Sequence, residues 1–140
     1  MEAQQNQQVQ QDRQVRQDRT EEAGRALGDL VGKWLDWAET ADHLGVSVSK
    51  VRQLIRDHQL AAAVPSEGAG PRVPAELVMD GAIVKGVPGV LTVLHDAGYD
   101  DREALTWLFT ADDSLPGRPI DALRENRGSE VKRRAQAMGF

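Results

Sequence analysis

The sequence of 140 residues contains no cysteine, and aromatic residues make up only 4% of it. Without cysteine the chain can form no disulfide, thiolate metal site or cysteine nucleophile, and a reducing compartment is expected. No segment approaches the roughly 20 apolar residues of a membrane span, and the N-terminus has no apolar run of the signal-peptide kind. We therefore expect a cytoplasmic protein without a membrane partner, its core built mainly from Ala, Val and Leu.

Residues 1–28 differ in composition from the rest of the chain. Eight of the first 20 residues are Gln, and the branched apolar residues there are Val9 and Val15. Such a segment buries too little apolar surface to offset its ordering entropy, which predicts a disordered Gln-rich tail. Thr20, beside an acidic pair, is a candidate phosphorylation site, although a solvated polar residue without that role is the favoured interpretation.

A helix-turn-helix is predicted between residues 36 and 58. Asp36 and Glu39 have the spacing of a capping box, which starts a helix running to Leu44. Gly45 can take the left-handed conformation that ends this helix, and Ser47 can cap a second helix over residues 48–58. The inner face of the first helix is expected to bury three residues: Ala38, Ala41 and Leu44.

Two short extended runs follow, residues 60–64 and 71–74, around the sequence PSEGAG. Extended runs on either side of a Pro- and Gly-rich loop predict a minimal β-hairpin. A hairpin directly after a helix-turn-helix is the arrangement of a winged helix-turn-helix. We therefore expect a winged helix-turn-helix DNA-binding domain over residues 29–79.

The second helix has two distinct faces at about 100° per residue. One face gathers the apolar side chains: Val48, Val51, Leu54 and Ile55. Ser49, Gln53 and Arg56 lie opposite, with Lys50 and Arg52 on the flanks. Small polar and basic groups on the outer face suit a helix in the major groove of DNA. The alternative is an amphipathic surface helix with solvated charges. The candidate DNA contacts are Ser47, Ser49, Lys50, Arg52, Gln53, Arg56 and Arg72.

The overall net charge of −5 is unevenly distributed along the chain. Residues 50–72 carry four basic and two acidic residues, a net of +2, and residues 118–140 carry six and three, a net of +3. Local charge determines contact with phosphates, so the acidic total does not exclude DNA. A net of +2 is nevertheless modest, and we expect binding as a homodimer or with help from the wing and the C-terminal arginines.

Residues 80–140 predict a small helical C-terminal domain. Pro88 begins one helix, which ends at Gly98, and Asp100 or Asp101 caps the next. Further helices are expected over residues 120–125 and 129–138. The fold predicted for the whole chain is mainly α, with one short hairpin.

The segment ADHLGVSVSKVRQLIRDHQLAAAV, with VPAELV after the loop, resembles the excisionase and MerR-like class of winged helix-turn-helix domains. With IVKGVPGVLTVLHDAGYDDREALTWLFTADDSLPGRPIDAL and EVKRRAQAMGF, residues 30–140 resemble an actinobacterial DNA-binding family typified by a mycobacterial Ser/Thr-kinase substrate. The resemblance implies double-stranded DNA and a kinase as partners, and a wing at Ser66–Arg72. The recognition-helix contacts that it implies are Ser49, Lys50, Arg52, Gln53 and Arg56. This wing has few basic residues, and the tail lies outside the resemblance.

A second similarity involves WLFTADDSLPGRPIDALRENRGSEVKRRA, which resembles the C-terminal domain of Xre/MbcA-type antitoxins. It implies a partner-docking surface at Trp107, Arg118 and Pro119. The favoured alternative places Trp107 in the core and gives residues 117–119 the role of positioning the last helices.

Neither catalysis nor a cofactor is predicted. His43, His58 and His95 lie in separate segments without metal-ligand spacing. The carboxylate pairs at 100–101 and 112–113 suit caps and loops better than acid–base catalysis. We therefore predict a nucleoid-associated DNA-binding protein that regulates transcription. The rival prediction is an antitoxin-like interaction module, or a nucleoid-type protein that binds DNA without regard to sequence.

Overall fold

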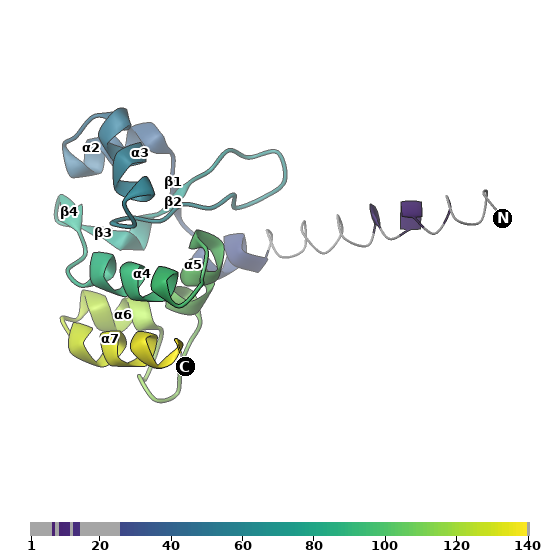
Figure 1. Cartoon of the computed structure of the whole chain (residues 1–140). Coiled ribbons are helices and arrows are strands. Elements are labelled where there is room, and N and C mark those ends of the chain that lie inside the picture. The colour runs from purple at the N-terminus through teal and green to yellow at the C-terminus, as the bar shows by residue number, and fades with distance from the viewer. Residues whose placement is uncertain (1–6, 8, 12, 15–25, 140) are drawn as a thin grey trace.

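The computed structural model describes residues 7, 9–11, 13–14 and 26–139. Thr20 and most of the predicted tail therefore lie outside the described residues. Between residues 34 and 139 the chain forms six α-helices, α2 to α7, around two small antiparallel sheets, which confirms the predicted mainly helical fold. Figure 1 shows α2 and α3 at the top and the later helices, α4 to α7, stacked below them.

The folded part begins earlier than the sequence predicted. Residues 26–31 form a helix, and Leu27 and Val31 are 3% and 6% exposed. Leu27 lies inside the tail predicted for residues 1–28, and the boundary at residue 28 stays a prediction. A single leucine among polar residues gives no periodic signal, and its burial depends on distant partners.

The helix-turn-helix forms as predicted. α2 (Trp37–Leu44) starts at Asp36 with both hydrogen bonds of the capping box, and Gly45 ends it in the left-handed conformation. α3 (Val48–Arg56) starts at Ser47, whose side chain accepts a hydrogen bond from the backbone N–H of Lys50. On α2 the exposed Ala38 was wrongly expected in the core. Thr40 is buried instead, its hydroxyl donating to the Asp36 carbonyl at 2.7 Å.

The predicted hairpin is only partly correct. Ala63 and Arg72 form an isolated antiparallel bridge at the base of the wing loop. The next residues, β2 (Val73–Pro74), pair instead with β1 (Trp34–Leu35), a strand the sequence analysis missed. A two-residue strand is too short to show an alternating pattern. The wing therefore rests on the segment that precedes α2.

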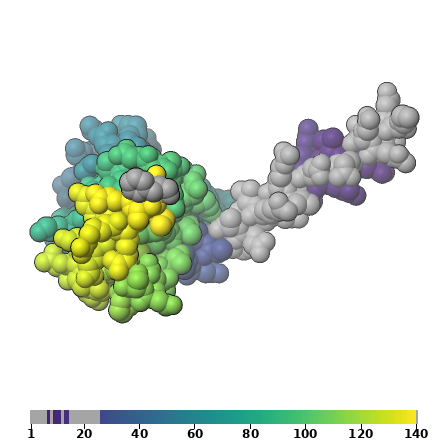
Figure 2. Space-filling view, turned by 60° about the horizontal axis from the view of Figure 1, so that its bottom comes forward, coloured from purple at the N-terminus to yellow at the C-terminus, as the bar shows by residue number. Residues whose placement is uncertain are grey.

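A second small sheet leads into the C-terminal half. After the 3₁₀ turn at Ala75–Leu77, β3 (Val78–Met79) and β4 (Ala82–Ile83) pair around Asp80 and Gly81. The helices that follow agree with prediction to within one or two residues. They are α4 (Val87–Asp96), α5 (Asp101–Phe109), α6 (Pro119–Arg124) and α7 (Gly128–Ala137). α7 forms much of one face of the molecule, yellow in Figure 2.

A single hydrophobic cluster connects these elements. It runs from Leu27 and Val51 through Leu77 to Phe109 and Val131, and it includes residues on both sides of position 79. The predicted division into two domains at that position stays a prediction. None of the helices among the described residues combines the length and apolar character needed to cross a membrane.

Candidate nucleic-acid interface

The inner face of α3 fixes the helix against the core. Val51 is fully buried, and Leu54 and Ile55 are half-buried against the hydrophobic cluster. Val48 was expected on the same face but is 36% exposed, because it lies in the first turn, beyond the edge of the packed surface. Three anchoring side chains are enough to define which face of α3 points outward.

The outer face of α3 carries the predicted reader. Ser49, Lys50, Arg52, Gln53 and Arg56 are all exposed. The three basic side chains make no ion pair or side-chain hydrogen bond with any residue that the structure describes. The helix itself contains no acidic residue. The structure therefore presents three uncompensated cations and two small polar groups on one surface.

The wing adds little positive charge to this surface. Its loop, residues 64–71, projects away from the helices (Figure 1) and contains Glu67 but no Lys or Arg. Arg72 stands at its base and is half-buried, with its backbone paired to Ala63 in both directions at 2.9 and 3.0 Å. Of the candidate contacts, Arg72 is thus the one that lies off the exposed helix face. Ser47 is exposed beside that face, with its oxygen engaged as the cap.

The C-terminal arginines are arranged differently, because four of them bind other parts of the protein. Arg118 pairs with Glu76 at 2.7 Å and with Asp121 at 2.6 Å. These carboxylates raise the pKa of the Arg118 guanidinium, and the hydrogen bonds from Arg118 hold the pKa of Asp121 below its ordinary value. Arg118 thereby joins the 3₁₀ turn after the wing to the start of α6.

The other three of these arginines also form hydrogen bonds or ion pairs within the protein. Arg124 donates to the carbonyl oxygens of Glu76 and Val78. Arg127 pairs with Glu125 at 2.8 Å, and Arg134 donates to Ser114. The net charge of +3 predicted for this segment therefore overstates what DNA could reach. Lys132 and Arg133 remain as exposed cations without a partner among the described residues.

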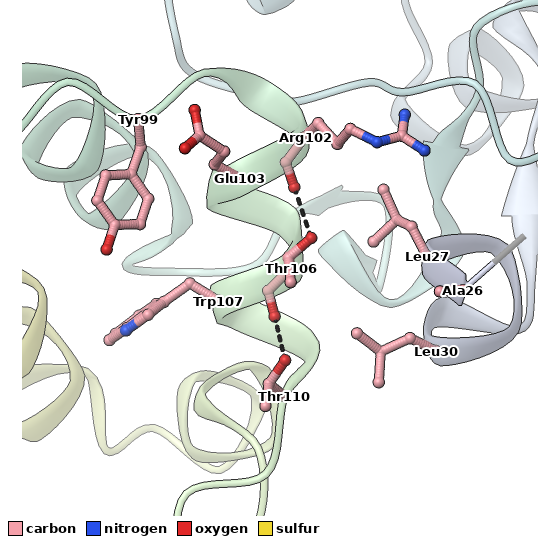
Figure 3. Close-up of a pocket in the computed structure, with 9 residues that line it drawn as sticks. All are labelled: Ala26, Leu27, Leu30, Tyr99, Arg102, Glu103, Thr106, Trp107 and Thr110. Carbon is pink, nitrogen blue, oxygen red and sulfur yellow. Dashed lines mark hydrogen bonds between the residues drawn. The ribbon is translucent and has the colours of Figure 1, made fainter. Parts of the chain in front are cut away.

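Two of the three residues nominated as a partner surface, Trp107 and Pro119, line the same shallow pocket at the end of α5. Pro119 is buried, and Arg118 is engaged with Glu76 and Asp121. Trp107 is half-buried and lines a groove beside α5. Figure 3 shows Leu27 and Leu30 facing α5 from residues 26–31, with Trp107 on another side of the helix. The structure thus brings Trp107 and Pro119 together, whereas the Arg118 guanidinium is engaged with Glu76 and Asp121, and a partner surface here stays a prediction.

Sequence spacing missed one convergence of polar residues. His58 follows α3 and His95 lies on α4, yet their rings stack with centroids 3.8 Å apart. His43, in contrast, is exposed on α2, as expected. The acidic pairs have the structural roles expected of caps and turns. Asp100 caps α5, and Asp112 accepts hydrogen bonds from Ser114 that lower its pKa.

Comparison with known proteins gives consistent results for both halves of the chain. Residues 28–78 match the model of the winged helix-turn-helix domain of the DNA-binding protein Rv2175c, and residues 84–139 match the Rv2175c C-terminal domain of unknown function. The chain is 42% identical over 118 residues to DNA-binding protein Rv2175c of Mycobacterium tuberculosis, an alignment covering 75% of this chain and 80% of that protein. The NMR structure of Rv2175c superposes with a TM-score of 0.69 at 40% identity, covering 77% and 82% of the two chains. The resemblance predicted from the sequence motifs is therefore confirmed, and the chain belongs to the Rv2175c family of winged helix-turn-helix DNA-binding proteins.

Proposed function

We propose that this protein binds double-stranded DNA by placing α3 in the major groove, and that it acts there as a transcriptional regulator. The observation that carries the proposal is a difference between two groups of basic side chains, those on α3 and the C-terminal arginines. Lys50, Arg52 and Arg56 have no internal partner among the described residues, whereas four C-terminal arginines do. Only the first group is available to a polyanion at no cost in broken contacts.

The residue types on α3 suit direct reading of base edges. The Gln53 amide can both donate to and accept from adenine, and an arginine such as Arg56 can donate twice to guanine. Ser49 is small enough to let the backbone approach the groove. Lys50 and Arg52, on the flanks, are placed to contact the phosphates on either side. Sequence preference would thus come from the centre of the helix and affinity from its edges.

The amount of charge favours binding by two copies. The three cations of one α3 would displace about three counterions from DNA, which corresponds to a slope of about −3 in a plot of log affinity against log salt concentration. That is a small electrostatic contribution, and the wing supplies no further cation between residues 64 and 71. A homodimer reading half-sites about 34 Å apart would double the slope and the number of base contacts.

The direct test compares two double variants by fluorescence anisotropy on duplex DNA at several salt concentrations. Gln53→Ala with Arg56→Ala should weaken binding at least about tenfold and reduce the salt slope by about 1 per protomer. The matched control is Arg133→Ala with Gln136→Ala, which removes the same two residue types from exposed positions on α7. Equal loss of affinity in both variants would overturn the assignment of α3 as the reader.

A regulator also requires preference for particular sequences. Selection from a random duplex library should enrich a defined motif with the unaltered protein, and the motif should be lost or relaxed with Gln53→Ala. Recovery of sequences without any common motif would favour a nucleoid-type function in which the protein coats DNA. Retained binding with no motif and a co-purifying protein released by Trp107→Ala would favour the antitoxin-like alternative.

A further inference from the structure

Three potential metal ligands meet where α3 ends against the C-terminal half. They are His58, His95 and Asp101, and one ligand atom from each lies within 4.8 Å of the other two. Asp101 Oδ1 is 2.8 Å from His95 Nε2. The residues come from three different elements, because His58 follows α3, His95 is in the last turn of α4 and Asp101 opens α5. Their convergence is a product of the tertiary fold.

His58 takes an unfavourable backbone conformation at this position. Its φ angle is +58°, in the left-handed region that non-glycine residues seldom adopt. The backbone N–H of His58 bonds to the Ile55 carbonyl at 3.1 Å, so the chain turns immediately after α3. This turn places the His58 imidazole against that of His95, with an angle of 30° between the ring planes.

The His95 side chain presents a nitrogen that the protein itself leaves unsatisfied. Its exposed fraction is 13%, and Nε2 is buried without a hydrogen bond to any described residue. Asp101 Oδ1 is close enough for an ion pair but does not have hydrogen-bond geometry to this nitrogen. Buried polar atoms almost always have a hydrogen-bond partner, so a buried ring nitrogen without one is unusual. An unsatisfied ring nitrogen beside a second imidazole and a carboxylate suggests that a cation completes the group.

Asp101 is held in place by the chain while keeping one oxygen available. Its Oδ2 accepts a hydrogen bond from the backbone N–H of Ala62 at 3.2 Å, which leaves Oδ1 directed at the histidines. Such an outer contact is what orients a carboxylate ligand in many metal sites. The same bond fixes residues 60–62 next to the end of α3.

We propose that His58, His95 and Asp101 bind a divalent transition metal ion, with Zn²⁺ as the best match. Two imidazole nitrogens and one carboxylate oxygen form a donor set that zinc accepts, with bonds of about 2.0–2.2 Å. At a tetrahedral ion those bond lengths separate the ligand atoms by roughly 3.3 Å. The present separations of 2.8 Å and up to 4.8 Å bracket this value, and because the two rings now stack, binding requires the imidazoles to rotate until one nitrogen of each points at the ion. Water would complete the coordination.

The site joins the proposed reading helix to the C-terminal half at a single point. A bound ion would connect the turn after α3 to α4 and α5, and it would stabilise the folded chain in proportion to its affinity. This inference concerns metal binding alone, so it stands or fails separately from the proposal about DNA.

The test uses the full chain without an affinity tag, stripped with chelator and dialysed into metal-free buffer. Titration with Co²⁺ should produce the visible absorption bands of a low-coordinate site and saturate at one ion per chain. Adding Zn²⁺ should displace the bound Co²⁺, and Zn²⁺ should raise the Tm of the protein. His58→Asn should weaken Zn²⁺ binding at least about tenfold, as should His95→Gln. Asn tolerates the left-handed backbone at position 58, so this variant is expected to fold.

The control is His43→Asn, which removes the exposed histidine of α2 and should leave the cobalt spectrum and the zinc affinity unchanged. Circular dichroism checks that each variant is folded before titration. Absence of saturable binding by the unaltered chain would overturn the proposal and leave His95 and Asp101 as a structural contact. Unchanged affinity in folded His58→Asn, or equal loss in His43→Asn, would overturn it as well.

Discussion

Replacing Arg118 with methionine should destabilise the protein by uncoupling the winged half from the C-terminal half. The variant keeps much of the aliphatic stem and removes the guanidinium. That group makes four side-chain hydrogen bonds, two to Glu76 at 2.7 and 3.0 Å and two to Asp121 at 2.6 and 2.9 Å. It also lies 5.4 Å from the centre of the Phe109 ring. The substitution therefore leaves two carboxylates without their shared cation.

The size of the effect depends on how exposed those carboxylates are. The side chains of Glu76 and Asp121 are 32% and 34% exposed, so each can regain water when the cation is lost. The values of 3–5 kcal/mol typical of a broken buried pair therefore do not apply, and about 0.5 kcal/mol per bond is reasonable. We expect a loss of roughly 2 kcal/mol, which lowers Tm by about 6–10 °C in a domain of this size.

Urea unfolding followed by tryptophan fluorescence measures this loss. Arg133→Met, on the exposed face of α7, is the matched control and should cost less than about 0.5 kcal/mol. A double-mutant cycle with Glu76→Gln should give a coupling energy of about 1 kcal/mol. An Arg118→Met variant as stable as the Arg133→Met control would refute the idea that this cluster joins the two halves.

The same interaction predicts a dependence on pH. Arg118 lowers the pKa of Asp121 from its ordinary value of 3.8, so folding favours the ionised carboxylate. The stabilisation is therefore complete above about pH 4 and is lost as the pH falls through the lower folded-state pKa. The stability difference between the unaltered chain and Arg118→Met should shrink below pH 4. A difference that stays constant from pH 7 to pH 3 would contradict this account.

Two further substitutions test local features of the fold. Gly28→Ala would push a methyl group into the Pro65 carbonyl oxygen, and we expect the free energy of unfolding in urea to fall by about 1–3 kcal/mol. Gly70 has open space around it, so Gly70→Ala should leave the stability nearly unchanged. Ser47→Ala removes the cap of α3 and should lower the free energy of unfolding by about 1 kcal/mol. Ser129 is exposed and caps no helix, so Ser129→Ala should lower it far less. Equal effects of the two serine variants would argue against the capping role.

The parts of the fold that the sequence predicted well are those governed by neighbouring residues. Asp36 with Glu39 and Asp100 with Glu103 specify helix starts within four residues, and the structure contains both capping boxes. The exposed face of α3 was predictable for the same reason, since the helical period alone places Gln53 and Arg56 opposite Val51. Local chemistry was sufficient in each case.

The features that were missed depend on partners distant in the chain. β1 exists because Trp34 and Leu35 find Pro74 and Val73 about 40 positions later, and two residues carry no pattern of their own. The share of the positive charge of residues 118–140 that is open to DNA could not be predicted, because charge counting does not reveal that Arg118 binds Glu76. Spacing in the sequence likewise could not indicate that His58 and His95 stack.

The continuous hydrophobic cluster has a consequence for how the protein can be divided. The two family models meet between residues 78 and 84, yet buried side chains on either side of that gap pack into one core. A fragment ending at residue 78 would expose part of that core to water, so we expect it to aggregate or remain unfolded. Heating the full chain should correspondingly give one cooperative transition. The C-terminal half would then act as an intramolecular folding partner for α3, and a role of this kind would require no binding site of its own.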